Sequence, residues 1–547
     1  MRKIGLLIVL SALVCAAWAV PARRDGIVKT QPDGSQITVY QHGDEHFRWI
    51  TNEKGEWLKI DEDGFYKVTK ALSSEEVRAK QMAAPSRVAQ AQKVASPLNI
   101  APRGLVILVN FQDVTFETSK AEMDSMLTGK NYIRNYSYNY NGKNYVVSSE
   151  GSAWKYFYDS SNGHYDPQFD VVGPVMVSKN MAYYGKNNPS TNFDAAPWTM
   201  VKEACTLVND SVDFSLYDND KDGYVDFVYV IYAGYGEADG GEENTIWPHS
   251  YWLLDAGITC KMDGKYVDLY ACGNEMDSYT DHHTGIGTFC HEFSHVLGLP
   301  DLYETTGYGT HKTIGAWSIL DYGPYSNDGN TPPAYSAYER FFMGWLIPRL
   351  IVDAENVELE ELQKSNSALL ISSTDQHNLI GNDPRPTTFY LLENRQQIGW
   401  DEYLPGHGMM LTKVQFSSNT WLDNSVNNNA KKMGVDLIEA DGKTPNSRQS
   451  GYDGKPGDLF PAGATEYLGI TDHSIEQVLE KDGVIYFKYK GGLDDPNFGT
   501  KVEDVATTQV LAIYNILGQK QTTVDVESLP RGTYVVVTAT GNKKIVK

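Results

Sequence analysis

The segment 290–301, CHEFSHVLGLPD, constrains the chain more than any other part of it. His291 and His295 are four residues apart, and residues at that spacing lie on one face of a helix, so both imidazoles can face one metal ion. Glu292 lies about 100° further round the same helix, which places its carboxylate beside the metal. The spacing predicts a helix that carries two zinc ligands and a general base.

A third ligand is expected from the chain reversal after this helix. Gly298 stands where a residue with positive φ would end the helix and turn the chain back, which would bring Asp301 to the metal. A catalytic zinc takes three protein ligands and leaves one position for water. Zinc lowers the pKa of that water to about 7, and Glu292 can take its proton, so the pattern predicts metal-assisted hydrolysis.

A different zinc architecture would take its third ligand from a later helix. Residues 334–345, AYSAYERFFMGW, are predicted to be helical and carry Glu339. Only its residue type favours Glu339, whereas Gly298 and Asp301 stand at the spacing that a reversing chain needs.

The pattern HExxHxxGxxD resembles the metzincin signature, with aspartate in place of the usual third histidine. Residues 289–303, FCHEFSHVLGLPDLY, resemble the active-site segment of the immune inhibitor A-like secreted metalloproteases, which implies that Asp301 is the third ligand. The resemblance also implies a Met-turn at 315–322, with Leu320 where methionine is expected; such a swap usually costs under about 1.5 kcal/mol. Tyr322 matches a tyrosine of related metzincins, where a phenol can stabilise the developing oxyanion. The alternative is an ordinary aromatic residue in a chain with 35 tyrosines.

The N-terminus has the pattern of a secretory signal. Arg2 and Lys3 precede an apolar run from Ile4 to Val14, and Ala17-Trp18-Ala19 matches a signal peptidase site. The run is far shorter than the ~20 residues that span a bilayer. We expect an exported protein. A lipid anchor on Cys15 is the alternative, disfavoured because Val14 stands where a lipobox needs a small residue.

A chain of 547 residues is expected to fold as several domains, because single cores stop growing near ~250 to 300 residues. We predict an α/β (α+β) metzincin-like zinc protease catalytic domain with a β-rich prosegment, a C-terminal β-sandwich and a small β sorting domain. The predicted boundaries are 1–19 for the signal peptide, 20–103 for the prosegment and linker, 104–349 for the catalytic domain, 350–491 for the β-sandwich, 492–505 for a linker and 506–547 for the sorting domain.

Residues 30–44, TQPDGSQITVYQHGD, resemble the start of the same family's propeptide, which implies a zymogen. Latency through a thiolate on the zinc is excluded, because there is no cysteine between Ala16 and Ala204. Asp44 either caps the metal or lies in a plain surface turn, and the turn is favoured. Activation would cleave after Arg87, Lys93 or Arg103.

Residues 245–249 are expected to form an edge strand to which an extended substrate adds. His249 is expected to have a structural role.

The chain changes character after residue 491 and resembles the sorting domain of type IX secretion, in the segments 513–519, 529–534 and 543–547. The resemblance implies passage through that secretion machinery, with attachment to the cell surface left open. Four cysteines follow the signal; they allow three disulfide connectivities, and four buried thiols are nearly as plausible.

The formal charge of −23 argues against a nucleic-acid or anionic-membrane partner. An acidic chain can also bind calcium. Residues 218–226, DNDKDGYVD, indicate a calcium-binding loop, because they place carboxylates at loop positions 1, 3, 5 and 9 with glycine at 6. Position 12 is Tyr229 where an EF-hand has glutamate, so a solvated acidic turn is the alternative. The candidate structural calcium ligands are Asp218, Asp220, Asp222, Tyr224 and Asp226.

The sequence as a whole predicts a secreted zinc endopeptidase that cleaves extracellular proteins or peptides. His291, His295 and Asp301 are the expected zinc ligands, with Glu292 and Tyr322 as catalytic groups. The rival from another class is an exported adhesin in which the metal only braces the fold. A second rival is a zinc amidase or glycoprotease acting on cell-wall or mucin material. Substrate preference and oligomeric state are not readable.

Overall fold

The computed structural model of the chain describes most residues beyond the predicted signal peptide. The described ranges are 19–45, 47–73, 75–77, 80, 101–189, 192–306, 311–443, 454–495, 498–499, 510–515, 519–522, 529–530, 533–538 and 541–546. The lipid-anchor candidate Cys15 and the candidate cleavage sites at Arg87 and Lys93 lie outside them. Among the described residues, no helix is both long and apolar enough to cross a membrane.

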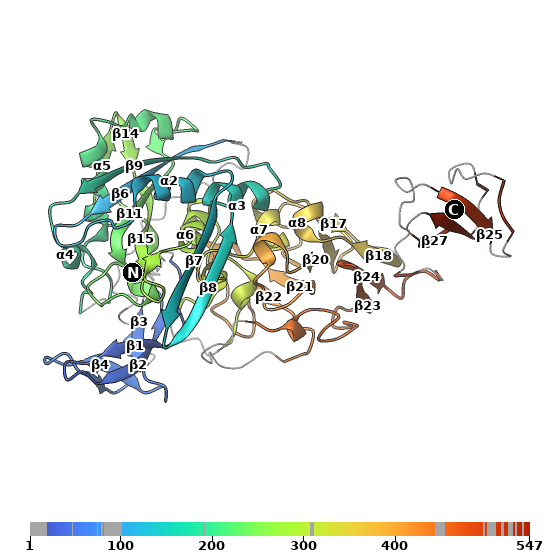
Figure 1. Ribbon diagram of the computed structural model, residues 1–547, viewed down its shortest axis with the longest axis horizontal. Coiled ribbons are helices and arrows are strands. Elements are labelled where there is room, and N and C mark those ends of the chain that lie inside the picture. The colour runs from blue at the N-terminus through green and yellow to red at the C-terminus, as the bar shows by residue number, and fades with distance from the viewer. Residues whose placement is uncertain are drawn as a thin grey trace, which may run out of the picture.

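The first folded unit is an antiparallel sheet in the order β1-β2-β3-β4-β5 (Figure 1). Turns with glycine at positive φ, such as Gly34 and Gly64, separate several of its strands. The bounds are Ile27–Thr30, Gln36–Gly43, Arg48–Thr51, Trp57–Ile60 and Tyr66–Val68.

The central sheet has the order β12-β15-β11-β6-β9, with β16 also paired to β15. The strands β15, β11, β6 and β9 are parallel, whereas β12 and β16 run antiparallel to β15. The apolar run 104–110 belongs to β6, and residues 104–109 are buried because helices cover both faces of the sheet. The bounds are β6 Arg103–Asn110, β9 Gln168–Met176, β11 Val228–Tyr235, β12 His249–Trp252, β15 Leu269–Asp277 and β16 His282–His283.

The two faces of β6 have different partners. Leu105, Ile107 and Val109 share a core with helix α5, Pro197–Val208. Val106 and Leu108 belong to a second core, which they share with three helices. These are α2 Lys120–Thr128, α3 Ala153–Ser160 and the histidine helix α6 Gly287–Val296. The expected edge strand at 245–249 is displaced: β12 begins at His249 and continues to Trp252. His249 is buried between Trp247 O and Tyr270 Oη, which confirms a structural role.

Two further sheets follow the central one and pack face to face (Figure 1). One contains β17 Arg349–Leu350, β19 Leu369–Ser372, β20 Thr388–Arg395, β21 Gly408–Gln415 and β22 Val435–Leu437. The other contains β18 Glu355–Leu359, β24 Val484–Tyr489 and β23 Ile475–Lys481. The sandwich has a core of its own, but Leu370 and Phe389 also belong to the core of the histidine helix. The sandwich and the central sheet therefore share buried surface.

The remaining elements are short. They are the hairpin β7 Ile133–Tyr140 with β8 Lys143–Glu150, the sheet of β10 Tyr224–Val225, β14 Lys265–Val267 and β13 Cys260–Met262, the helices α4 Met181–Gly185, α7 Ala337–Phe342, α8 Leu362–Ser365 and α9 Ser418–Leu422, and the C-terminal sheet of β25 Val510–Asn515, β26 Thr533–Thr538 and β27 Gly541–Val546. The C-terminal sheet has a small core that includes Ile513 and Val536. All four cysteines after the predicted signal are buried free thiols.

Candidate active site

Helix α6 positions the two histidines because its opposite face is aromatic. Phe289 and Phe293 pack on the central sheet, with the Phe293 ring centroid 4.6 Å from that of Phe227. The helix ends as predicted: Gly298 has φ +96°, and its N–H donates to His295 O at 2.9 Å. A left-handed residue there reverses the chain at little steric cost because glycine has no Cβ.

The reversal brings Asp301 to the histidines, and three ligand atoms converge. His291 Nε2 and His295 Nε2 are 3.0 Å apart, and Asp301 Oδ1 lies 3.3 and 3.2 Å from them. Tetrahedral zinc with bonds of about 2.0 to 2.1 Å places neighbouring ligand atoms about 3.3 Å apart. The three separations therefore match one zinc coordination sphere, and all three side chains are buried.

Hydrogen bonds behind the histidines fix which nitrogen faces the site. His291 Nδ1 lies 2.7 Å from Ile319 O, and His295 Nδ1 lies 2.8 Å from Leu299 O. Because a carbonyl only accepts, each Nδ1 carries the proton and each neutral Nε2 presents a lone pair. Two lone pairs and a carboxylate oxygen then face one another in a buried space, an arrangement that a cation stabilises. The residues present fit zinc.

Asn424 orients the third ligand, and sequence reasoning did not find it. Its Nδ2 donates to Asp301 Oδ2 at 2.6 Å, which leaves Oδ1 for the metal, and its Oδ1 accepts from Asp301 N at 2.8 Å. Burial tends to raise the pKa of Asp301, but His295 and His291 outweigh it and keep that pKa below its ordinary value. Asp301 is therefore held as a carboxylate.

Glu292 is fully buried, as His291 and His295 are. Burial raises its pKa well above the ordinary value, and a hydrogen bond from Val20 N to Glu292 Oε1, 2.8 Å long, opposes the rise. A carboxyl group with a raised pKa next to a metal site is suited to hold a proton and pass it on. The structure therefore places Glu292 where the helix geometry predicted it.

The partner of Glu292 belongs to the N-terminal segment, here residues 19–26, which crosses the site. Tyr303 Oη donates to Ala19 O at 2.5 Å, and Trp247 Nε1 donates to Val20 O at 3.0 Å. Residues 19–23 are all buried. The peptide group between Ala19 and Val20 thus donates its N–H to Glu292 and accepts a hydrogen bond from Tyr303 at its carbonyl. Sequence reasoning did not anticipate these contacts.

Tyr322 contacts this same segment further along. Its hydroxyl accepts from Arg24 N at 2.9 Å, and its ring lies 4.5 Å from the Arg24 guanidinium carbon. The predicted Met-turn lies directly below the histidines, since Ile319 O accepts from His291 and Leu302 N donates to Leu320 O at 2.8 Å. Tyr322 follows that turn, but the phenol next to the Ala19 carbonyl is that of Tyr303.

The structure disfavours one alternative and contradicts one expectation. The alternative third ligand, Glu339, has other partners: its carboxylate accepts from Ser318 Oγ and from Ser336 N in a capping box that begins helix α7. Asp44 does not lie in a surface turn. It is 1 % exposed, and its turn is closed by Phe47 N donating to Asp44 Oδ1 at 3.1 Å. Burial follows because the turn packs on the body of the protein rather than projecting into solvent.

The acidic loop brings together three of its candidate ligands. Carboxylate oxygens of Asp218, Asp220 and Asp222 lie within 4.8 Å of one another. Lys265 Nζ pairs with Asp218 Oδ2 at 2.6 Å, and Asp226 accepts from Asn219 N at 2.9 Å. Tyr224 begins the short strand β10. The loop therefore groups three carboxylates and turns Asp226 to a neighbouring backbone amide.

The site taken together is that of a metal-dependent hydrolase, with three convergent ligand atoms and an adjacent carboxylate. Residues 92–346 match the model of the immune inhibitor A peptidase M6 catalytic domain. The chain is 28 % identical to the pre-pro-metalloprotease PrtV of Vibrio cholerae serotype O1 (strain M66-2) over 262 residues, which cover 43 % of this chain and 28 % of that protein. It is 26 % identical to immune inhibitor A of Bacillus thuringiensis subsp. alesti over 291 residues, which cover 48 % and 42 % of the two chains.

These comparisons support a metalloprotease of that family, a metalloendopeptidase hydrolase, over the matched segment. The matched segment contains all three ligands and Glu292. The chain spans less than half of the length of the relatives it matches.

Proposed function

We propose that this chain is a secreted zinc-dependent endopeptidase, made as a zymogen, that hydrolyses peptide bonds of extracellular proteins. The proposal depends most on one observation, the convergence of His291 Nε2, His295 Nε2 and Asp301 Oδ1 at separations of 3.0 to 3.3 Å. The largely parallel central sheet with the antiparallel strands β12 and β16, the histidine helix and the turn below it support a metzincin-like catalytic domain.

Bound zinc would supply a water of lowered pKa and polarise the peptide carbonyl. His291, His295 and Asp301 would hold that ion, and Glu292 would accept a proton from the attacking water and return it to the leaving amide nitrogen, the position that Val20 N occupies here. A phenol at the carbonyl oxygen stabilises the negative charge that develops there. Tyr303 occupies that position in this structure, next to the Ala19 carbonyl. Tyr322, the tyrosine expected from the resemblance, contacts the N-terminal segment further along, at Arg24.

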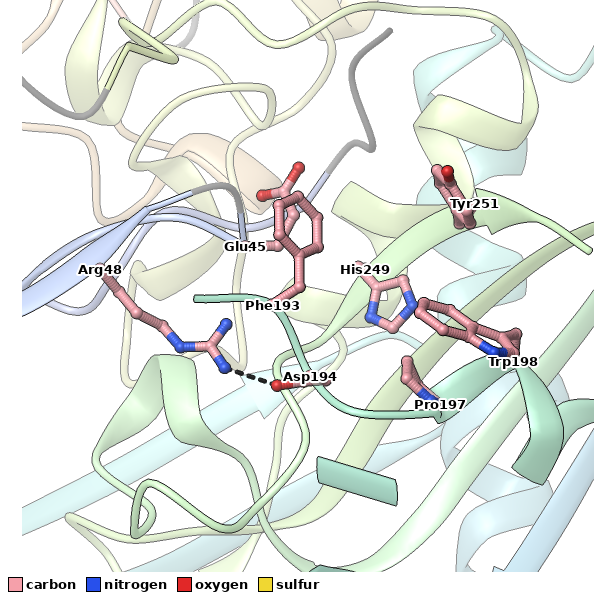
Figure 2. Close-up of a pocket in the computed structure, with 8 residues that line it drawn as sticks. All are labelled: Glu45, Arg48, Phe193, Asp194, Pro197, Trp198, His249 and Tyr251. Carbon is pink, nitrogen blue, oxygen red and sulfur yellow. Dashed lines mark hydrogen bonds and ion pairs between the residues drawn. The ribbon is translucent and has the colours of Figure 1, made fainter. Parts of the chain in front are cut away.

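The zymogen proposal is supported by the N-terminal segment itself. It fills the position of a substrate backbone and occupies Glu292, so a substrate has no access while the segment is in place. Arg48 on β3 holds the first sheet to the catalytic domain through Glu237 at 2.7 Å and through Asp194. Figure 2 shows the pair of Arg48 and Asp194 at a pocket that residues of both parts line. Activation then requires removal of this sheet.

Three finer proposals accompany this function. The carboxylates of Asp218, Asp220 and Asp222 are candidate ligands of a structural calcium, with backbone and water oxygens completing the shell. The C-terminal sheet β25-β26-β27 is proposed as the sorting domain that engages a secretion machinery. Proteins or peptides are proposed as the substrates, and the signal pattern at residues 1–19 supports export.

The test is the Glu292→Ala variant. We expect it to bind zinc at the same stoichiometry as the wild type, because Glu292 is not a ligand, and to cleave casein slower by several orders of magnitude. A hydroxamate should inhibit the wild-type enzyme. If the protein is an adhesin braced by metal, neither the wild type nor Glu292→Ala will cleave casein. An amidase or glycoprotease would also leave casein intact. Turnover of casein by Glu292→Ala at the wild-type rate would remove Glu292 from the mechanism.

A further inference from the structure

The N-terminal segment has a defined register in the active site. The amide nitrogen of Val20 lies 2.8 Å from Glu292 Oε1, where the leaving nitrogen of a substrate must receive its proton. The carbonyl of Ala19 accepts from Tyr303 Oη at 2.5 Å, on the other side of the same peptide bond. This polarity is that of a substrate. Val20 therefore occupies the first position C-terminal to the scissile bond, and Arg23 the fourth.

Signal cleavage after Ala19 would remove the Ala19 carbonyl and keep Val20 to Arg23 in the chain. The nitrogen of Val20 would then be an amine at Glu292, which is where the amine of a cleavage product lies. In this structure, Pro21, Ala22 and Arg23 follow Val20 and are buried. Arg23 N is fixed by its own hydrogen bond to Ala238 O at 2.8 Å.

Arg23 lies in a site built from the catalytic part of the chain. Its Nη1 is 3.0 Å from Asp277 Oδ2 at the end of β15, and its Nη2 is 2.7 Å from Asp328 Oδ1. The guanidinium carbon lies 3.9 Å above the ring centroid of Tyr279. The Arg23 side chain is 6 % exposed. Two carboxylates and an aromatic face are the groups that recognise a guanidinium or ammonium group.

Both carboxylates are oriented by their own neighbours and not by Arg23 alone. Asp277 Oδ1 accepts from Tyr279 N and Thr280 N, which turns Oδ2 to the guanidinium. Asp328 Oδ2 accepts from Tyr138 Oη at 2.7 Å, which turns Oδ1 to the guanidinium. Each carboxylate thus presents one oxygen to the cleft by contacts that do not involve the N-terminal segment.

Removal of the N-terminal segment would leave two carboxylates without their cation in a partly desolvated site, and such charges favour a new cation. We infer that Asp277, Asp328 and Tyr279 form a subsite for a basic side chain, so that the enzyme prefers polypeptides with arginine or lysine at the fourth position after the cleaved bond. This inference rests on the proposed function and names its substrate class.

The first test uses the zinc-loaded enzyme after its prosegment has been removed, with fluorogenic peptides that continue Val-Pro-Ala-X after the cleaved bond. We expect kcat/KM with X as arginine to exceed that with alanine by on the order of tenfold, with lysine close behind and glutamate below alanine. Moving the arginine to the fifth position should abolish the advantage. An arginine-to-alanine ratio near one would overturn the subsite and leave the endopeptidase proposal standing.

The variants Asp277→Asn and Asp328→Asn test the assignment of the two carboxylates. Asp328 has a left-handed backbone at φ +51°, which the Asp328→Asn variant can keep because asparagine tolerates that conformation. Each variant should lower the arginine-to-alanine ratio, and the double variant should bring it near one. Glu358→Gln, an exposed change on β18, is the matched control and should keep the ratio. A ratio retained in the double variant would overturn the inference.

A binding measurement separates the subsite from catalysis. The Glu292→Ala variant, freed of its prosegment, is titrated with a labelled peptide Val-Pro-Ala-Arg-Arg-Asp and with its analogue in which the first arginine is alanine. We expect tighter binding of the arginine peptide by on the order of tenfold. Arginine-dependent binding without any cleavage by the wild type would support the subsite and contradict the proposed function. Equal binding of the two peptides would contradict the subsite.

Discussion

Both ends of the Asn424 carboxamide form hydrogen bonds with Asp301, although the two residues are 123 positions apart in the chain. One hydrogen bond fixes the backbone of Asp301 and the other its outer oxygen, so the inner oxygen alone faces the histidines. Asn424 comes from the loop after helix α9, within the part of the chain that forms the sandwich. The sandwich therefore supports the metal site directly.

Replacement of Asn424 by glycine should lower zinc affinity by roughly 10- to 100-fold, the usual cost of losing a partner that orients a metal ligand. Glycine is chosen because Asn424 has φ +49° and glycine adopts that conformation freely. Competition with a chromophoric chelator measures the affinity. The matched control is Asn141→Gly, the same substitution at φ +51° in an exposed turn, and unchanged zinc affinity in Asn424→Gly would contradict the orienting role.

Gly298→Ala should weaken zinc binding because a Cβ at φ +96° strains the reversal that delivers Asp301. The backbone penalty for a left-handed L-residue is about 1 to 2 kcal/mol, and relaxation of the turn would displace Asp301. Gly257→Ala, at φ +73° with open space around its Cβ, has a similar backbone penalty far from the metal. We expect both variants to lower the thermal midpoint and only Gly298→Ala to lower zinc affinity. Equal zinc affinities of the two variants would show that the turn at Gly298 does not control the position of Asp301.

Arg48→Met should loosen the first sheet from the catalytic domain. The substitution leaves Asp194 and Glu237 buried without their cation, and breaking a buried pair in this way costs about 3 to 5 kcal/mol. Dilute subtilisin should cut the sheet from the variant much faster than from the wild type, as followed by gel and N-terminal sequencing. Lys59→Ala, an exposed change on β4, should leave the rate unchanged. A wild-type rate in Arg48→Met would show that other contacts hold the sheet.

Asp436→Asn should stabilise the protein in a pH-dependent way. Burial raises the pKa of Asp436 to about 6, with Glu439 adding to the rise and Lys413 opposing it. A raised pKa in the folded state means that Asp436 favours folding at low pH and that this contribution is lost as pH rises through about 6. Asparagine stays neutral, so the variant should gain about 1 to 2 kcal/mol at pH 8 and little at pH 4.

Thermal unfolding at the two pH values measures this difference. The exposed Asp353→Asn change removes the same charge at the surface and serves as the control. A gain of equal size at both pH values would mean that the Asp436 carboxyl does not titrate with a raised pKa in the folded protein.

The sequence predicted the parts of the site that lie close together in the chain. His291, Glu292 and His295 follow from the period of a helix, and Gly298 from the backbone that only glycine adopts at low cost, so a single short segment determined four positions. Local reasoning also favoured Asp301 over Glu339, whose carboxylate belongs to a capping box in the structure.

Partners from distant segments were beyond local reasoning. Asn424, Tyr303, Asp277 and Asp328 have no spacing that marks them, and each acquires its role from a contact across the fold. Asp44 was expected at the surface because Gly-Asp is a common turn, and only the packing of that turn on the body of the protein buries it.

The sequence alone therefore determined the local pattern of candidate metal ligands, because helix periodicity and the conformational freedom of glycine act over a few residues. The tertiary structure decided what holds Asp301 in place, what fills the cleft and which side chain the cleft accepts. Those properties depend on hydrogen bonds and ion pairs between segments more than a hundred residues apart, and such contacts exist only once the sheets and helices have packed.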